Sequence, residues 1–198
     1  MTTRPVAVLI GPPGAGKSTV GPLLAELLGA EFAETDQMVE EVAGKPVSDI
    51  FLTDGEPAFR DLERTAAARA LAQHPGIVAL GGGAVMDLPT RERLARHRVV
   101  YLQTGFAAAV RRVGLDTPRP LLLGNPRARM RELLAERLPV YESLARITVV
   151  TDDRDPQEIA DEIAAAVTAR IAAAAGEGAG TGPEDGEWAG EEDDDGDA

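Results

Sequence analysis

One segment, Gly11-Pro12-Pro13-Gly14-Ala15-Gly16-Lys17-Ser18, restricts the fold of this chain more than any other feature of its sequence. It matches the pattern G-x-x-x-x-G-K-S/T and lies between a short apolar run and a stretch of helical periodicity, which is the context that the pattern requires. The glycines let backbone N–H groups turn toward phosphate oxygens, and the helix that follows directs its positive dipole end at them. Lys17 would neutralise the outer phosphates, and Ser18 would hold Mg²⁺. We therefore predict a nucleoside triphosphate site with contacts from Gly14, Ala15, Gly16, Lys17, Ser18 and Thr19.

Short β-branched runs alternate with helical segments along most of the chain. We expect strands at 6–10, 31–33, 77–80, 99–102 and 147–150, and helices at 18–28, 36–42, 56–73, 90–96, 106–112, 127–138 and 157–175. Five strands, each followed by a crossover, predict a parallel sheet covered by helices on both faces. The fold class is therefore a three-layer α/β/α domain over residues 1–175.

The last residues, 176–198, differ in composition from the rest of the chain. Ten acidic residues and no basic residue lie there, in a chain of net charge −13, so the rest of the chain is close to neutral. A near-neutral body predicts no nucleic-acid partner, because a phosphate backbone requires a basic face. We expect an acidic disordered tail, and the alternative is a docking tail anchored by Trp188.

Several functional classes are excluded or disfavoured by what the sequence lacks. The chain has no cysteine, which excludes disulfides and thiolate catalysis. Its first apolar run, 6–10, is too short for a signal peptide or a membrane span, so we expect a cytoplasmic protein without a membrane partner. His74 and His97 are far apart in sequence and are interpreted as surface residues rather than metal ligands.

The strand ends favour phosphoryl transfer to a small molecule over a motor or switch function. Motors and switches usually carry an aspartate after a second apolar strand, whereas 77–80 and 99–102 are followed by Gly81 and Gln103. Asp36, beside Glu34 after the second strand, is a candidate base for a hydroxyl proton or a helix N-cap. Arg60 lies near a helix start, where its charge is unfavourable to the dipole unless it binds an anion.

Two further segments complete the candidate site. Gly81, Gly82 and Gly83 follow a buried strand and indicate a close approach of the backbone, either to a packed helix or to a ligand. The segment 111–131 carries six arginines and one aspartate around a Gly/Pro-rich loop. We interpret 113–126 as a mobile lid that places Arg119 against the transferring phosphoryl group, and Arg127 and Arg129 as solvated helix residues.

Together these residues resemble shikimate kinase, a P-loop kinase family of the nucleoside-monophosphate-kinase-like fold. The resemblance spans about residues 6–170. It rests on the phosphate loop and on five motifs: Glu34-Thr35-Asp36, Asp54-Gly55-Glu56 with Phe59-Arg60, Leu80-Gly81-Gly82-Gly83-Ala84-Val85, Arg119-Pro120-Leu121-Leu122 and Arg137-Leu138-Pro139-Val140-Tyr141. The family commonly has Asp-x-Asp where this chain has Glu34-Thr35-Asp36, so the longer Glu34 would alter any support of Mg²⁺.

The resemblance implies an activity and a role for each site residue. The activity is ATP-dependent phosphorylation of the 3-hydroxyl of shikimate, by a monomer that uses Mg²⁺. Asp36 would be the base, with Lys17 and Arg119 as the other catalytic residues. The shikimate carboxylate would be held by Arg60 and Arg137, and the ring by Gly81, Gly82 and Gly83. Near the adenine, the resemblance implies Arg112, Arg154 and Pro156.

Two other functions remain open from the sequence. A gluconate-type or adenylate-type kinase shares the phosphate loop and the sheet, but it gives no reason for Arg60, Gly82 and Arg137 together. A nucleotide-binding regulator without transfer activity is disfavoured because the chain has all four of the residues expected for transfer, Lys17, Ser18, Asp36 and Arg119.

Overall fold

Five strands form one parallel sheet in the computed structural model, which describes residues 4–113 and 126–177. The strand order is β2-β3-β1-β4-β5, and every neighbouring pair is parallel. The strands are β1 (Ala7–Ile10), β2 (Phe32–Glu34), β3 (Ile77–Ala79), β4 (Val99–Gln103) and β5 (Ile147–Val150). The predicted three-layer fold is confirmed.

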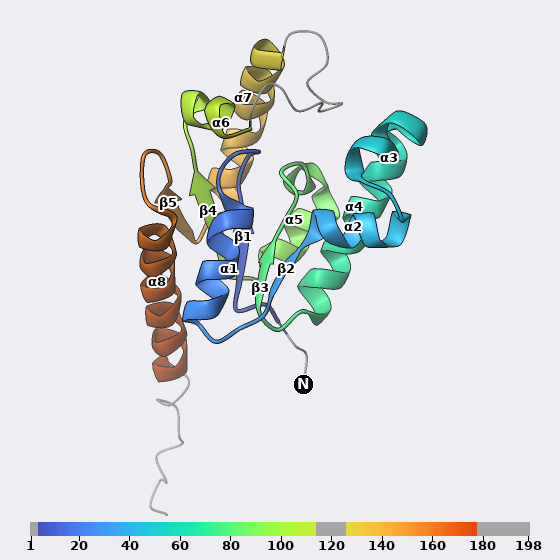
Figure 1. The fold of residues 1–198 in the computed structure, drawn as a ribbon. Coiled ribbons are helices and arrows are strands. Elements are labelled where there is room, and N and C mark those ends of the chain that lie inside the picture. The colour runs from blue at the N-terminus through green and yellow to red at the C-terminus, as the bar shows by residue number, and fades with distance from the viewer. Residues whose placement is uncertain (1–3, 114–125, 178–198) are drawn as a thin grey trace, which may run out of the picture.

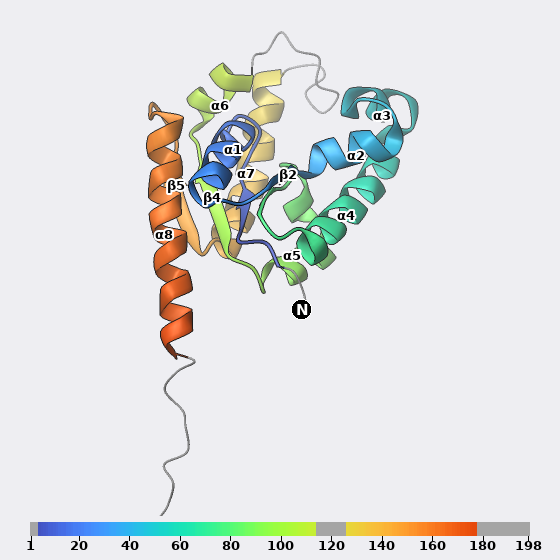
Figure 2. The ribbon, with the colours of Figure 1, turned by 60° about the horizontal axis from the view of Figure 1, so that its bottom comes forward.

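Helices cover both faces of this sheet (Figure 1). On one face, α1 and α8 pack on the buried side chains of the strands, and on the other face α4, α5 and α7 do so. The helices are α1 (Lys17–Leu27), α2 (Thr35–Ala43), α3 (Val47–Thr53), α4 (Gly55–Gln73), α5 (Leu88–Leu94), α6 (Phe106–Val113), α7 (Pro126–Leu144) and α8 (Pro156–Glu177), with a short 3₁₀ helix η1 (Ala84–Met86). Figure 2 shows α3 and α8 on opposite flanks of the molecule.

The central strand β1 determines where a ligand can bind. All four of its residues are buried, because helices cover it above and below and apolar side chains point both ways. In the sheet, β1 has β3 on one side and β4 on the other; the chain forms β2 and β3 on the first side and then crosses to form β4 and β5 on the second, so the strand order reverses at β1. Ligands of such sheets bind at the carboxyl ends of the strands near this reversal. The phosphate loop follows β1 at that edge.

The largest differences from the sequence-based expectation concern α3 and α7, beside small shifts of other bounds and the unpredicted η1. The helix α3 was not predicted; it packs Ile50 against Val39 and Phe59 of α2 and α4 in a small separate core. The helix α7 continues through Pro139 to Leu144, although its predicted end was residue 138. Pro139 removes one N–H from the helix. The turn that follows is nevertheless fixed by Tyr141, whose ring stacks on that of Tyr101 with 5.2 Å between the ring centroids.

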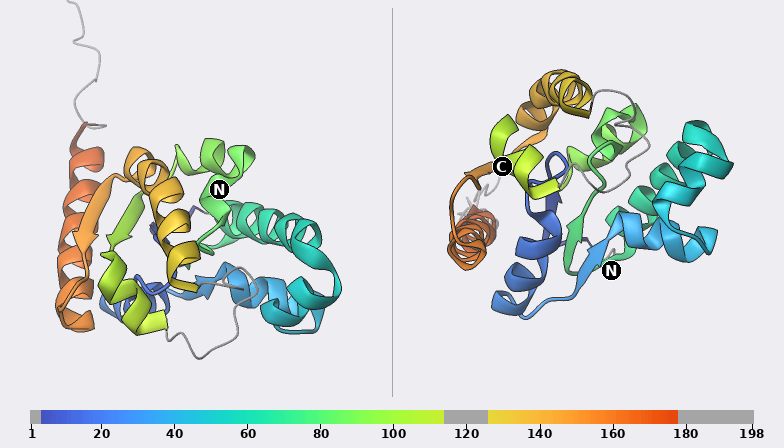
Figure 3. Two further views of the ribbon diagram at one scale, coloured as in Figure 1. Left: turned by 90° about the horizontal axis from the view of Figure 1, so that it is seen from above. Right: turned by 45° about the horizontal axis from the view of Figure 1, so that its top comes forward.

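The predicted lid and acidic tail lie almost wholly outside the described residues. Of the lid, 113–126, the structure describes only its first and last residues, which end α6 and begin α7. α8 ends at Glu177, two residues beyond the predicted domain boundary. Figure 3 shows α6 and α7 together at the edge where β1 ends. Among the helices of the described segments, none has the length and apolar character needed to cross a membrane.

Candidate active site

The phosphate loop wraps around the ammonium group of Lys17. Gly14 and Gly16 have φ angles of 80° and 96°, which side-chain-bearing residues rarely adopt. A Cβ on Gly14 would also stand 2.8 Å from the carbonyl oxygen of Ala109. Lys17 Nζ is buried and donates to the carbonyl oxygens of Gly11 and Pro12 at 2.7 and 3.2 Å. The loop is therefore closed on itself, with its cation at the centre.

Ser18 and Glu34 lie next to one another at the start of α1. Ser18 Oγ donates to Glu34 Oε1 at 2.6 Å, and both Ser18 and Thr19 are exposed. A hydroxyl and a carboxylate oxygen are ligands that suit Mg²⁺, which usually keeps water and phosphate oxygens in its remaining positions. The described residues contain no cluster of three or more His, Asp or Glu side chains that could hold a metal alone. The residues present therefore fit an ion shared with a nucleotide.

Asp36 and Glu63 converge on Gly81. The N-cap of α2 is Glu34, so Asp36 is a residue of the first helical turn and not the cap. A Cβ on Gly81 would stand 2.5 Å from Asp36 Oδ1 and 2.8 Å from Glu63 Oε1, which explains the glycine by a close approach to two carboxylates. Thr35 Oγ1 accepts from the backbone N–H of Gly81 at 2.9 Å and fixes the start of α2 to this segment.

Arg60 is held between two carboxylates of its own helix. Its guanidinium is 2.5 Å from Glu63 Oε2 and 3.1 Å from Glu56 Oε1. Burial alone would lower the pKa of Arg60, but the negative charges of Glu63 and Glu56 outweigh burial and raise it. Burial raises the pKa of Glu63, against the lowering effect of Arg60, and the charge of Asp36 adds to the rise. Arg60 is therefore a permanent cation beside a buried acid.

Arg137 and Tyr141 meet the same carbonyl group. Arg137 Nη1 and the Tyr141 hydroxyl both donate to the oxygen of Gly82, at 3.0 and 2.6 Å. Arg137 is buried, and its Nε has no hydrogen-bond partner among the described residues. A cavity of about 350 Å³ is lined by both Arg60 and Arg137, together with Glu63 and Gly83. The structure thus brings the two predicted carboxylate-binding arginines into one cavity.

Gly82 joins this cavity to the phosphate loop. A Cβ on Gly82 would stand 3.1 Å from Cδ of Pro13 and 3.5 Å from the carbonyl oxygen of Gly11. On the far side, a Cβ on Gly83 would meet the guanidinium of Arg60. The three glycines therefore let the loop, the carboxylates and the arginines approach one short backbone segment.

Of the residues predicted near the adenine, Arg112 of α6 contacts the phosphate loop, whereas Arg154 and Pro156 follow β5. Arg112 donates to the carbonyl oxygen of Gly14 at 3.3 Å and to Thr151 Oγ1 at 2.9 Å. Arg154 pairs with Glu162 at 2.7 Å, and Pro156 begins α8. The predicted residue Arg119 lies outside the described residues.

Sequence reasoning assigned no role to Glu63 and Tyr141. Glu63 follows Arg60 by three residues, a spacing that places both on one helix face. This spacing was the sequence signal that could have indicated their ion pair. Tyr141 follows Arg137 by four residues, again one helical turn away, and belongs to a motif already recognised.

Comparison with known proteins decides the family. The family model for shikimate kinase matches residues 13–168. A shikimate kinase of Thermobifida fusca is 63% identical over 164 residues, which cover 83% of this chain and 95% of that protein. The chain belongs to the shikimate kinase family.

Other shikimate kinases agree in sequence and in fold. The protein of Salinispora arenicola is 56% identical over 161 residues, covering 81% of this chain and 96% of that one. The structure of shikimate kinase from Acinetobacter baumannii in complex with shikimate superposes with a TM-score of 0.80 at 36% identity, covering 85% of this chain and 95% of that chain. The kinase fold predicted from the sequence is thus the fold of the family.

Proposed function

We propose that this protein transfers the γ-phosphoryl group of ATP to the 3-hydroxyl of shikimate. The observation that carries the proposal is the double contact of the Gly82 segment. On one side it adjoins Pro13 of the phosphate loop, and on the other its carbonyl oxygen accepts from Arg137 of the cavity. A phosphoryl donor and an anionic acceptor held at these two places would be neighbours.

The phosphate loop would hold the donor. When a triphosphate is bound, Lys17 exchanges the carbonyl oxygens of Gly11 and Pro12 for phosphate oxygens, while the loop N–H groups surround the rest. Ser18 would bind Mg²⁺, with Glu34 supporting it; the ion would neutralise charge on the phosphates. Arg112, through its contact with the Gly14 carbonyl, would keep the loop against β5 next to the adenine.

The cavity would hold the acceptor by its carboxylate. Arg60 and Arg137 present guanidinium groups, whose forked N–H donors suit a carboxylate, and the Nε of Arg137 is buried without a hydrogen-bond partner among the described residues. Such a buried donor is costly until an acceptor binds it. The hydroxyl groups on the other side of the ring would then face the carboxylate of Asp36.

Asp36 would act as the base. It would accept the proton of the 3-hydroxyl as that oxygen bonds to the γ-phosphorus, while the bond from this phosphorus to the bridging oxygen breaks and ADP leaves. Arg119, which lies in the predicted lid outside the described residues, would stabilise the charge on the transferring group. We retain the predicted monomeric state and cytoplasmic location as expectations.

Acceptor dependence tests this function. With ATP and Mg²⁺ present, ADP release should require shikimate and should not be supported by gluconate or AMP. Equal turnover with gluconate or AMP would reject the assignment, and turnover without any acceptor would indicate an ATPase.

A further inference from the structure

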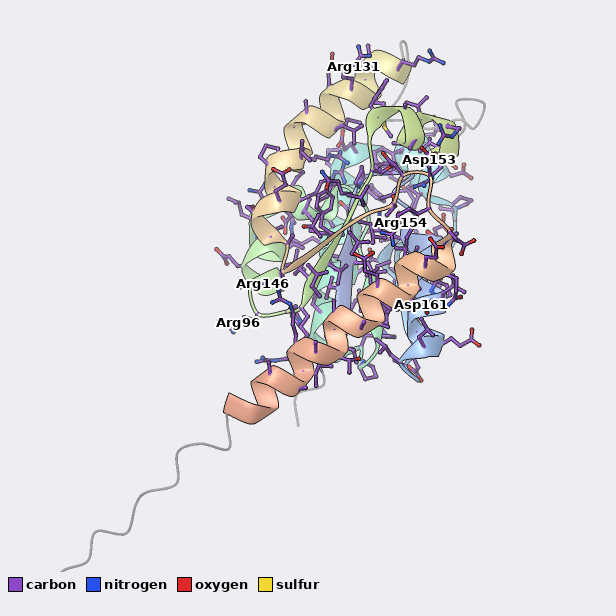
Figure 4. The ribbon with its side chains drawn as sticks, turned by 90° about the vertical axis from the view of Figure 1, so that its left-hand side faces the viewer. Arg96, Arg131, Arg146, Asp153, Arg154 and Asp161 are labelled. Atoms are coloured by element: carbon purple, nitrogen blue, oxygen red, sulfur yellow. The ribbon has the colours of Figure 1, made fainter. Side chains whose placement is uncertain are left out.

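Positively charged side chains gather at the edge of the sheet opposite to the phosphate loop. Arg4 lies three residues before β1, the pair Arg96 and Arg98 precedes β4, and Arg146 precedes β5. Figure 4 shows Arg96 and Arg146 near the C-terminal half of α8, far from Asp153 at the other edge. We call this surface the basic edge and define it by Arg4, Arg93, Arg96, His97, Arg98, Arg146 and Arg170.

Two adjoining cavities open on the basic edge. One, of about 440 Å³, is lined by Arg4, Arg93, Arg96 and His97, and also by apolar atoms of α4 and α5. The apolar part comes from Ala68, Leu71, Ala72 and Pro89. The second, of about 330 Å³, shares Arg4, Arg96 and His97 with the first and extends to Arg98, Arg146 and Arg170. The surface therefore combines a hydrophobic recess with an extended row of guanidinium groups.

The charge of the basic edge is not balanced within residues 4–113 and 126–177. None of its six arginines forms an ion pair there, whereas Arg60, Arg64 and Arg154 elsewhere all do. Of the described side chains that line the two cavities, Glu92 is the single acid. Burial and the nearby charge of Arg4 lower the pKa of His97, so the positive charge near neutral pH comes from the arginines. Such an excess in a chain of net charge −13 calls for an anionic partner.

The same chain carries an anionic segment that begins close by. α8 starts after β5 at the phosphate-loop edge and ends at Glu177, at the end of the molecule where the N-terminus lies (Figure 1). Arg170 of the basic edge is seven residues before Glu177, about 10 Å along the helix. Residues 178–198 contain nine acidic residues, no basic residue and the only tryptophan, Trp188. Six residues separate Glu177 from Glu184, and extended they span up to about 20 Å.

We propose that residues 178–198 dock on the basic edge of their own chain, with their carboxylates on its arginines and the Trp188 indole in the 440 Å³ cavity. Arginine suits both contacts, because guanidinium groups bind carboxylates in pairs and stack on aromatic faces. Covalent attachment gives the segment a high effective concentration, so weak individual contacts suffice. The docked segment neutralises a surface that would otherwise attract unrelated polyanions.

The single tryptophan makes this docking measurable in the full-length protein. At low salt, the emission of Trp188 in the full chain should lie at shorter wavelength than that of a synthetic peptide of residues 178–198, because docking removes the indole from water. In about 1 M KCl the two spectra should coincide, since the screening length there is only about 3 Å. The shift should not depend on protein concentration.

A charge-reversal pair tests the surface itself. Arg96 and Arg170 are exposed, and their side chains form no hydrogen bond or ion pair with another described residue. Arg96→Glu with Arg170→Glu should therefore give the peptide-like spectrum at low salt. The matched control is Arg69→Glu with Arg127→Glu, which changes two exposed arginines outside the basic edge by the same charge and should keep the shifted spectrum. Shikimate-dependent ADP release at the wild-type rate would show that the Arg96, Arg170 variant is folded.

Three results would overturn the proposal. The first is a peptide-like spectrum of the unmodified chain at low salt, which means that the segment does not dock. The second is a shift that grows with protein concentration, which assigns the surface to the segment of a second copy. The third is tight binding of a single-stranded oligonucleotide at low salt without any change in Trp188 emission. This result would mean that nucleic acid, and not residues 178–198, binds the basic edge. None of these results depends on the proposed catalytic function.

Discussion

Arg137 and Tyr141, one turn apart on α7, both donate to the carbonyl oxygen of Gly82, at 3.0 and 2.6 Å. This carbonyl belongs to the segment that also adjoins Pro13 of the phosphate loop. Arg137 also lines the proposed acceptor cavity, whereas Tyr141 is buried against Tyr101. We therefore expect Arg137 to bind the acceptor and Tyr141 to support the structure, and substitutions can distinguish these two roles.

Arg137→Ala should raise the KM for shikimate about tenfold to a hundredfold, the range for losing a charged hydrogen bond of about 1.5–3 kcal/mol. The KM for ATP should change little, because the phosphate loop keeps its own contacts. Steady-state kinetics with each substrate varied would measure both values. Arg127→Ala, an exposed arginine of the same helix, is the control, and an unchanged KM for shikimate in the Arg137 variant would remove this residue from the site.

Tyr141→Phe should lower the free energy of unfolding by about 1 kcal/mol and leave the KM for shikimate nearly unchanged. The ring and its stacking on Tyr101 are retained, and the hydrogen bond from the hydroxyl to the Gly82 carbonyl is lost. Urea denaturation followed by circular dichroism would give the stability. A KM change as large as that of Arg137→Ala would instead mean that the hydroxyl touches the substrate.

Arg119→Ala should lower kcat by about 10³-fold or more, as expected for an arginine that stabilises a transferring phosphoryl group. Arg127→Ala and Arg129→Ala should have much smaller effects, because both residues are exposed and Arg129 pairs with Glu132 on the helix surface. Single-turnover measurements would separate the chemical step from product release. Equal losses in all three variants would argue for a general effect of positive charge.

Glu63→Gln should change how stability depends on pH. In the folded protein, burial raises the pKa of Glu63 above its ordinary value of 4.5, so between 4.5 and the raised pKa the folded state binds more protons than the unfolded state. The contribution of Glu63 to the free energy of unfolding is therefore complete below pH 4.5 and is lost as the pH rises through the raised pKa. The stability of the unmodified chain minus that of the variant should fall from pH 4.5 to neutrality, measured by urea denaturation. A difference that grows with pH would contradict the raised pKa.

Ending the chain after Glu177 should leave kcat and both KM values within error of the full-length protein. The proposed catalytic residues Lys17 and Asp36 lie at the carboxyl edge of the sheet, whereas α8 ends at the opposite edge. The Thermobifida fusca relative supports such a boundary, because 164 residues of this chain account for 95% of its length. A loss of activity on truncation would show that residues 178–198 take part in catalysis.

Local sequence patterns were sufficient for the sheet and most helices. The central strands are covered on both faces, so β1, β3 and β4 appear as continuous β-branched or apolar runs that periodicity detects. The helix α3 was missed because seven residues carry little pattern of their own; Ile50 is buried only through contacts with Val39 and Phe59. The end of α7 was misplaced because a proline usually terminates a helix, and here Tyr141 anchors the turn beyond it.

The candidate site could likewise be predicted only where the signal lies within one sequence segment. Asp36 and Arg60 could be identified because each stands out within its own segment, and the resemblance added Arg137. The burial of Glu63 beside Arg60 could not be predicted, because a glutamate on a charged helix is normally solvated. Its burial depends on Arg60 and on the missing side chain of Gly81, which comes from a different element.

Amine-selective reagents meet only two lysine side chains in this chain, Lys17 and Lys45. Lys17 is 9% exposed and its Nζ is engaged by two carbonyl oxygens, whereas the side chain of Lys45 is 32% exposed and pairs with Asp54 at the surface. Of these two lysines, acylation should therefore begin at Lys45 and spare Lys17 of the phosphate loop. A fluorophore or a surface tether could thus be attached to the enzyme without first engineering a reactive position.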